Sequence, residues 1–219
     1  MYEISPLDVM VNFSAIIISI TVHEYAHAWT ANYLGDPTPA QHNRLNLNPI
    51  TLMKAHPFGS LLVPLFASTQ GFLIGWAATP VNPRLVNRKY SMRFAERWIA
   101  LAGPLSNVVL AIITAFLFSL CKKFRAIDPL TFDALIHLTH ALVLTNIFLA
   151  LFNLMPAHPF DGFIILKNTL SRQSPVIYFL QEYSQILFLF VFMVGFRILN
   201  PVIGFLYISL TGLFDWMIL

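Results

Sequence analysis

Two histidines and a glutamate lie close together in an apolar stretch, in the run His23-Glu24-Tyr25-Ala26-His27. Residues four apart lie on one face of an α-helix. Two imidazoles at that spacing can bind one Zn²⁺, and the adjacent glutamate can act as the general base of a hydrolytic reaction. At this chain's His and Glu content, about 0.004 such motifs are expected by chance. The motif indicates metal-dependent hydrolysis; the alternative is a polar stripe that faces a neighbouring helix.

A catalytic zinc ion usually has three protein ligands and an open position for water. Asp161 is the candidate for the third ligand. It follows an apolar run and a segment with Pro156 and Pro159, which cannot continue a regular helix and so opens the backbone. That opening lets a carboxylate turn toward a partner helix. The alternative is an ordinary turn aspartate before Gly162.

The composition is that of an integral membrane protein. Hydrophobic residues make up 57% of the 219 residues and charged residues 11%, with a mean hydropathy of +0.69, whereas soluble domains carry about 25% charged residues. The net charge of +3 comes from basic residues in short loops beside apolar runs, so it does not indicate a nucleic-acid partner. The single cysteine, Cys121, excludes an intrachain disulfide and a cysteine-based metal site.

The apolar runs predict an all-α polytopic membrane protein with about five transmembrane helices. A sixth run, Phe58–Trp76, contains polar residues and glycines, so it either spans the membrane or forms a re-entrant element. The Asn200-Pro201 pair separates the last two spans. The five predicted spans are Leu7–Leu34, Trp98–Leu120, Ala134–Met155, Val176–Phe196 and Val202–Leu219.

Charge placement favours the five-span arrangement, in which nine basic residues fall on one side and four on the other. The positive-inside rule then places the first group in the cytoplasm. In this topology His27 and Asp161 reach the same, cytoplasmic side. The larger group is Arg44, Lys54, Arg84, Arg88, Lys89, Arg93, Arg97, Lys167 and Arg172, and the smaller is Lys122, Lys123, Arg125 and Arg197.

Further motifs follow the histidine motif along the chain. They are Gly35-Asp36-Pro37-Thr38-Pro39-Ala40, Arg44-Leu45-Asn46-Leu47-Asn48-Pro49, Gly75-Trp76-Ala77, Pro80-Val81-Asn82-Pro83, Ala102-Gly103-Pro104-Leu105-Ser106-Asn107, and Asn153, Pro156 and Asp161-Gly162. With these motifs in this order, the chain resembles the site-2 proteases, which are intramembrane zinc metalloproteases. The resemblance is to the short form of the family, without PDZ or CBS domains.

The resemblance implies that His23, His27 and Asp161 bind one zinc ion per chain and that Glu24 is the catalytic base. It also implies that Asn153 helps to hold an unwound substrate, and that a membrane-associated β element lies between the first two core helices.

The expected organisation is a single intramembrane metalloprotease domain, 1–219, with a core at 7–165 and C-terminal helices at 176–219. Its expected substrate is a transmembrane segment of another protein, cleaved in or near the lipid bilayer of a prokaryotic cell membrane. The sequence does not identify any accessory or oligomeric partner.

Several other residues have expected roles outside the ligand set. Asn107 is expected to form a hydrogen bond between helices, and His158 is a candidate for a hydrogen bond near the metal. His56 stands where the family more commonly has aspartate. Two alternatives to proteolysis remain: a membrane zinc-binding or carrier protein that does not need Glu24, and a haem protein that uses His137 and His140.

Overall fold

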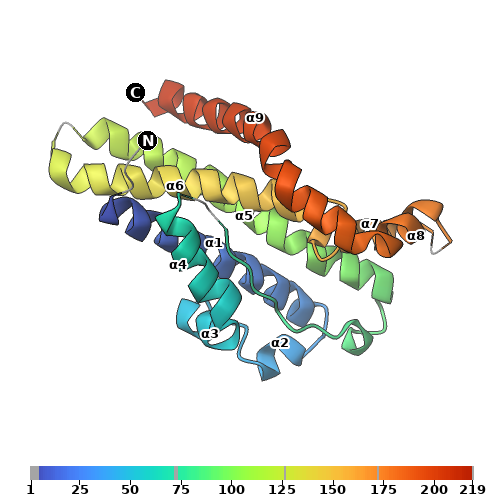
Figure 1. The fold of residues 1–219 in the computed structure, drawn as a ribbon. Coiled ribbons are helices and arrows are strands. Elements are labelled where there is room, and N and C mark those ends of the chain that lie inside the picture. The colour runs from blue at the N-terminus through green and yellow to red at the C-terminus, as the bar shows by residue number, and fades with distance from the viewer. Residues whose placement is uncertain (1–4, 72–73, 126, 172, 219) are drawn as a thin grey trace.

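The computed structural model describes residues 5–71, 74–125, 127–171 and 173–218, and all regular structure in them is helical (Figure 1). In chain order the elements are α1 (Pro6–Tyr33), α2 (Thr38–Gln41), α3 (Pro49–Ala55), the π-helical turn η1 (Phe58–Leu62), α4 (Val63–Thr69), the 3₁₀ turn η2 (Pro83–Leu85), α5 (Met92–Phe124), α6 (Pro129–Asn153), α7 (Asp161–Thr169), α8 (Pro175–Glu182) and α9 (Ser184–Ile218).

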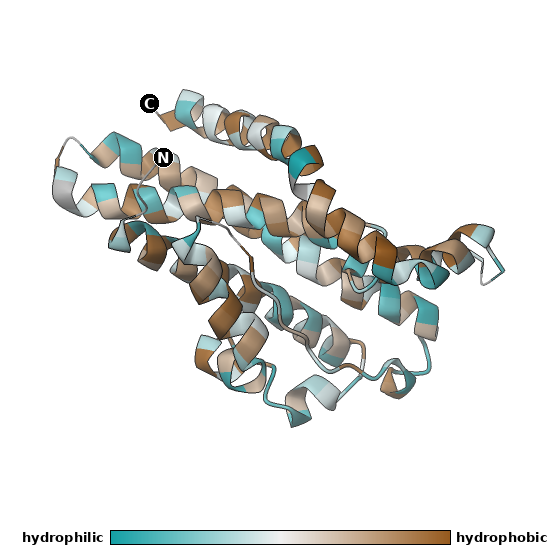
Figure 2. Ribbon diagram, in the orientation of Figure 1, coloured by the Kyte–Doolittle hydropathy of each residue, from teal (hydrophilic) through white to brown (hydrophobic). Residues whose placement is uncertain are grey.

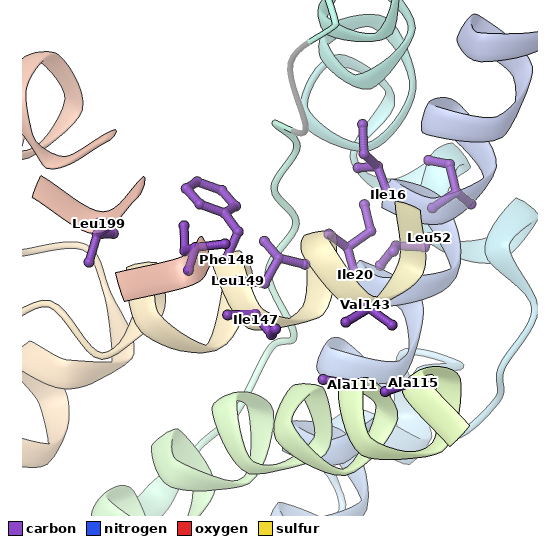
Figure 3. Close-up of a cluster of buried hydrophobic side chains, with 12 residues drawn as sticks. Ile16, Ile20, Leu52, Ala111, Ala115, Val143, Ile147, Phe148, Leu149 and Leu199 are labelled. Atoms are coloured by element: carbon purple, nitrogen blue, oxygen red, sulfur yellow. The ribbon is translucent and has the colours of Figure 1, made fainter. Parts of the chain in front are cut away.

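Three long helices, α1, α5 and α6, pack against one another and form the core. Small side chains at the contacts let the backbones approach closely, as is typical of helices in membranes. Figure 3 shows Ile16 and Ile20 of α1 beside Val143 of α6, with Ala111 and Ala115 of α5 next to them. The buried alanines of the core helices are Ala15, Ala28, Ala31, Ala95, Ala100, Ala111, Ala115, Ala141 and Ala150.

Local sequence signals set where these helices begin. Ser5 and Asp8 form a capping box at the start of α1: the Ser5 hydroxyl accepts from the Asp8 N–H, and the Asp8 carboxylate accepts from the Ser5 N–H. Ser91 accepts a hydrogen bond from the Phe94 N–H and caps α5. Pro129 takes the first position of α6, where a missing N–H costs nothing.

Four described helices are long and apolar enough to cross a membrane, or five if the bent pair of α8 and the first part of α9 counts as one span. Many large apolar side chains of these helices are exposed, and hydrophobic residues recur along the helices (Figure 2). The chain is therefore a multi-pass membrane protein, as its composition predicts. The four helices are Pro6–Tyr33, Met92–Phe124, Thr131–Asn153 and Arg197–Ile218.

The predicted break at Asn200-Pro201 is wrong, because α9 runs without interruption through this pair. A proline inside a membrane helix is tolerated where neighbouring groups satisfy the freed backbone carbonyl. The chain instead bends by 76° between α8 and α9. Arg197, expected in an outer loop, lies within α9, and Arg172 lies outside the described residues.

The far end of α9 returns to the end of α5, at the end of the bundle where α1 begins (Figure 1). There the Lys122 ammonium lies 2.5 Å from the Asp215 carboxylate, and the Lys123 ammonium donates to the carbonyl of Ile218. The C-terminal end of α9 therefore lies at the end of the bundle where α5 ends. Helix α7 begins toward the other end.

The region Phe58–Trp76 does not form a span. Its helical part, Phe58–Thr69, is short, and twelve residues rise about 18 Å, whereas a bilayer core is about 30 Å thick. No strand occurs in the described residues of this region, so the expected β element is wrong. The chain turns near Gly71, which has a φ of +74°, and comes back extended, with the Trp76 N–H donating to the Gly59 carbonyl.

The returning segment, residues 74–82, runs past α1 and is fixed at its far end by a buried carboxylate. Asp36 is fully buried and accepts hydrogen bonds from the Thr38 N–H, the Thr38 hydroxyl and the Asn82 N–H. Gly35 reaches a φ of +104° just before it, and a Cβ there would lie 2.9 Å from the Asn87 nitrogen. This tight turn is what brings residues 74–82 alongside α1.

Candidate metal centre

His23 and His27 lie one turn apart on α1, and both rings face α5. Their Nε2 atoms are 3.0 Å apart, and the side chains are almost inaccessible, with 6% and 9% of each residue exposed. Gly103 of α5 lies directly against both rings, where any side chain would overlap them. The Gly103-Pro104 motif therefore has a steric role in making room for the histidine pair.

Asp161 reaches the same point from α7, of which it is the first residue. Its Oδ2 atom is 3.2 Å from Nε2 of His23 and 3.4 Å from Nε2 of His27. The chain between α6 and α7 folds back so closely that a Cβ on Gly162 would overlap the carbonyl of Leu154. The structure thus brings the three predicted ligands together in one buried group.

The second nitrogen of each ring is held by α5. Nδ1 of His27 lies 2.7 Å from the Ile99 carbonyl oxygen, which can only accept, so Nδ1 carries the proton. Nδ1 of His23 lies 2.6 Å from Oδ1 of Asn107 and donates to it in the same way. Both Nε2 atoms therefore present a lone pair toward Asp161. This is the arrangement that metal-binding histidines usually adopt.

The three converging atoms fit a tetrahedral zinc site. At Zn–N and Zn–O distances of about 2.0–2.1 Å, two ligands of a tetrahedral ion are about 3.3 Å apart, and the observed separations are 3.0 to 3.4 Å. An anionic ligand beside two neutral imidazoles suits a divalent cation and leaves a fourth position open.

Glu24 lies beside the pair and is 7% exposed. Its carboxylate oxygen Oε2 is 2.7 Å from the Thr79 hydroxyl, which also lies 3.0 Å from the Glu24 carbonyl oxygen. Thr79 belongs to the extended segment 74–82, and the neighbouring Ala78 carbonyl accepts a hydrogen bond from Nε2 of His56 at 2.7 Å. The extended segment is therefore tied to the candidate base.

A cavity of about 450 Å³ opens in front of these groups. Asn153 and His158, both predicted from the sequence, belong to its wall, and the Asn153 amide also donates to the Leu149 carbonyl. The cavity is large enough for several residues of a peptide. Its lining is His23, Glu24, His27, Ala77, Ala78, Thr79, Val81, Pro83, Glu96, Ile99, Ala100, Asn153, His158, Pro159, Asp161, Phe163, Ile164 and Lys167.

The histidines proposed for haem do not join this site. Nδ1 of His140 is 2.6 Å from the Tyr207 hydroxyl. Among the described residues, neither His137 nor His140 belongs to a group of three metal-ligating side chains. Thr79 and Asn146 were not among the residues predicted from the sequence. For Asn146, a polar residue in the middle of an apolar helical run was the available signal.

Comparison with known proteins identifies relatives with matching names. The chain is 36% identical over 155 residues to the "Putative zinc metalloprotease YwhC" of Bacillus subtilis, an alignment that covers 70% of this chain and 66% of that protein. It is 31% identical over 168 residues to the "Putative zinc metalloprotease Rip2" of Mycobacterium tuberculosis strain H37Rv, covering 72% of this chain and 56% of that protein.

A second Rip2 protein, from Mycolicibacterium smegmatis, is 28% identical over 158 residues. The chain thus spans between about half and two thirds of the length of these relatives. No protein-family model matches the chain, and no solved structure matches it. The relatives support a zinc metalloprotease role, in agreement with the ligand group that the structure assembles.

Proposed function

We propose that this chain is an intramembrane zinc endopeptidase of the site-2 protease family. The observation that carries the proposal is the convergence of His23, His27 and Asp161 on one point, with Glu24 beside them in the wall of the same cavity. The names of the relatives support the chemistry, and the apolar helices around the site support its place within the membrane.

Zinc held by these three residues would supply Lewis acidity and a water molecule of lowered pKa. Glu24 takes a proton from the attacking water and delivers it to the nitrogen of the departing amine. The Thr79 hydroxyl holds the Glu24 carboxylate in one orientation while this happens. Ile99 and Asn107 hold the two histidine rings through their Nδ1 protons.

The substrate is a membrane-spanning segment that must unwind before it is cut, because a helix hides its carbonyls in its own hydrogen bonds. The extended segment 74–82 supplies replacement partners. In the described structure, Ala77, Thr79 and Val81 make no hydrogen bond through their backbone N–H or C=O groups, and all three line the cavity. An extended substrate strand can pair with this edge, with Asn153 on the wall of the same cavity.

The active site faces the cytoplasm of a prokaryotic cell in this proposal, as the distribution of basic residues indicates. The cavity lies at the end of the bundle where α5 begins, and the Arg93 guanidinium there donates to the carbonyls of Lys167 and Leu170. Basic side chains at this end suit the cytoplasmic surface of the membrane.

Metal content and proteolysis together test the proposal. Purified protein should contain about one zinc ion per chain, and His23→Ala and Asp161→Ala should each remove most of it. His140→Ala is the matched control, because that histidine binds Tyr207 away from the site. Wild-type protein in liposomes should cleave members of a panel of single-span proteins. Retained zinc without any cleavage would favour the zinc-binding or carrier alternative.

A further inference from the structure

A chain of polar side chains crosses the apolar core behind the metal centre. Asn146 of α6, Asn107 of α5 and Ser19 of α1 are all fully buried and hydrogen-bonded to one another. Around them the core consists of residues such as Val143 and Ile147. Burying an amide in such surroundings is unfavourable unless every polar atom has a hydrogen-bond partner. The positions of these partners therefore determine how each amide is oriented.

The hydrogen bonds fix the direction of each amide. The Asn146 Nδ2 group is 2.8 Å from the Leu142 carbonyl oxygen, which can only accept, and 2.9 Å from the Ser19 hydroxyl. The Oδ1 atom of Asn146 must therefore face Asn107, and it accepts from Asn107 Nδ2 at 2.7 Å. Asn107 Nδ2 also donates a longer hydrogen bond, of 3.4 Å, to the Ser19 carbonyl oxygen.

The orientation of the Asn107 amide determines which ring nitrogen of His23 carries the proton. With its Nδ2 group facing Asn146, Asn107 turns Oδ1 toward His23, and Nδ1 of His23 must then carry the proton, at 2.6 Å. The Nε2 lone pair is left for the metal. If the Asn107 amide were reversed, its NH₂ group would face Nδ1, favour the other tautomer and place a proton on Nε2.

We propose that Asn146 is a positioning residue for the zinc site: through Asn107, it holds His23 in the tautomer whose Nε2 can bind the metal. This inference rests on the proposed function, because it assumes that His23 is a metal ligand. Asn146 itself touches neither the histidines nor the cavity wall. Groups that hold a ligating histidine typically change metal affinity by about 10- to 100-fold when removed.

The test compares Asn146→Leu with Thr145→Val. Leucine keeps the branched shape of asparagine, although it is larger, and it cannot accept a hydrogen bond from Asn107. Thr145 is equally buried on the same helix, and its hydroxyl donates only to the Ala141 carbonyl of that helix. Zinc affinity, measured by competition with a chelator, should fall about tenfold in Asn146→Leu and should change less than about twofold in Thr145→Val.

A double-mutant comparison separates positioning from simple packing. Asn107→Ala should lower zinc affinity on its own, and adding Asn146→Leu to it should lower affinity no further, because Asn146 acts through Asn107. Additive losses would show that Asn146 only stabilises the bundle and would overturn the proposal. Ser19→Ala provides a milder variant if Asn146→Leu does not fold; it should give a smaller loss that likewise vanishes in the Asn107→Ala background.

The tautomer can be observed without metal or activity. In metal-free protein with ¹⁵N-labelled histidine, and with His23→Gln to assign the signals, wild type should show His23 protonated at Nδ1 alone. Asn146→Leu should show a mixture of the two tautomers, and Thr145→Val should match wild type. An unchanged tautomer in Asn146→Leu would contradict the proposal. If the tautomer effect is present but wild-type protein cleaves no substrate, the result would count against the proposed function only.

Discussion

Gly103 lies so close to His27 that an added Cβ would come within 2.5 Å of the ring atoms Cε1 and Nε2. The same Cβ would lie 2.6 Å from Cε1 of His23. A glycine on α5 is therefore what allows the histidine pair of α1 to stay between the two helices, and a single methyl group is enough to disturb the site.

Gly103→Ala should displace both imidazoles and lower zinc content to well below half of the wild-type value. A shift of ligand atoms by even a few tenths of an ångström departs from the narrow range of zinc–ligand distances. Metal analysis of the purified protein measures this. Gly204→Ala is the control, because a Cβ on Gly204 in α9 has no atom within 4 Å; equal zinc content in both variants would show that the steric argument is wrong.

Thr79→Val should slow cleavage about tenfold while leaving zinc content unchanged. Valine keeps the shape of threonine, but the hydrogen bond to the Glu24 carboxylate is lost. A hydrogen bond to a charged group contributes about 1.5–3 kcal/mol, and the lower end of that range corresponds to about tenfold in rate. The loss should appear in kcat, because the Thr79 hydroxyl holds the base. Thr79→Ser restores the hydroxyl and should restore most of the rate. A valine variant with normal kcat would remove Thr79 from the mechanism.

Asp36→Ala should destabilise the protein by about 3 kcal/mol, because the partly buried N–H donors of Thr38 and Asn82 lose their fully buried acceptor. Freeing the extended segment should also raise KM. Thermal unfolding in detergent and substrate titration measure the two effects. Asp133→Ala is the matched control, since the pair of Asp133 with Arg125 is about half exposed and should contribute less than about 1 kcal/mol. If Asp36→Ala and Asp133→Ala lower the free energy of unfolding by similar amounts, the role given to Asp36 is wrong.

Labelling of single cysteines in a Cys121→Ser background tests the membrane topology. Lys89 precedes α5, and the Lys167 carbonyl accepts from Arg93 at the same end of the bundle, so cysteines at 89 and 167 should be labelled from the cytoplasmic side. Lys122 lies in the last turn of α5, about 45 Å along the helix axis from its start, and should be labelled from the opposite side. Labelling of positions 89 and 122 from one side would exclude the proposed topology.

The sequence predicts which side chains meet in the candidate metal centre because simple geometry places them. Helix periodicity puts His23 and His27 on one face, and the prolines before Asp161 open the chain where the carboxylate must turn. The structure brings all three side chains together as expected. Glu24 is in the cavity wall because it directly follows His23.

Other features depend on contacts between segments far apart in the chain, which local patterns do not contain. Thr79 lies in an extended segment without periodicity, and its contact with Glu24 is made by the fold of residues 58–82. The expected break at Asn200-Pro201 is absent because an apolar helix can continue through a proline. The expected β element is replaced by short helices and an extended return.

The most direct test of the account replaces Glu24 by glutamine. The variant keeps the size of the side chain and a hydrogen-bonding oxygen but cannot accept a proton from water. Zinc content should stay near that of wild type, while cleavage of a single-span substrate should fall by about 10²–10⁴-fold, the usual effect of losing a general base. Cleavage by Glu24→Gln at the wild-type rate would contradict the metalloprotease mechanism.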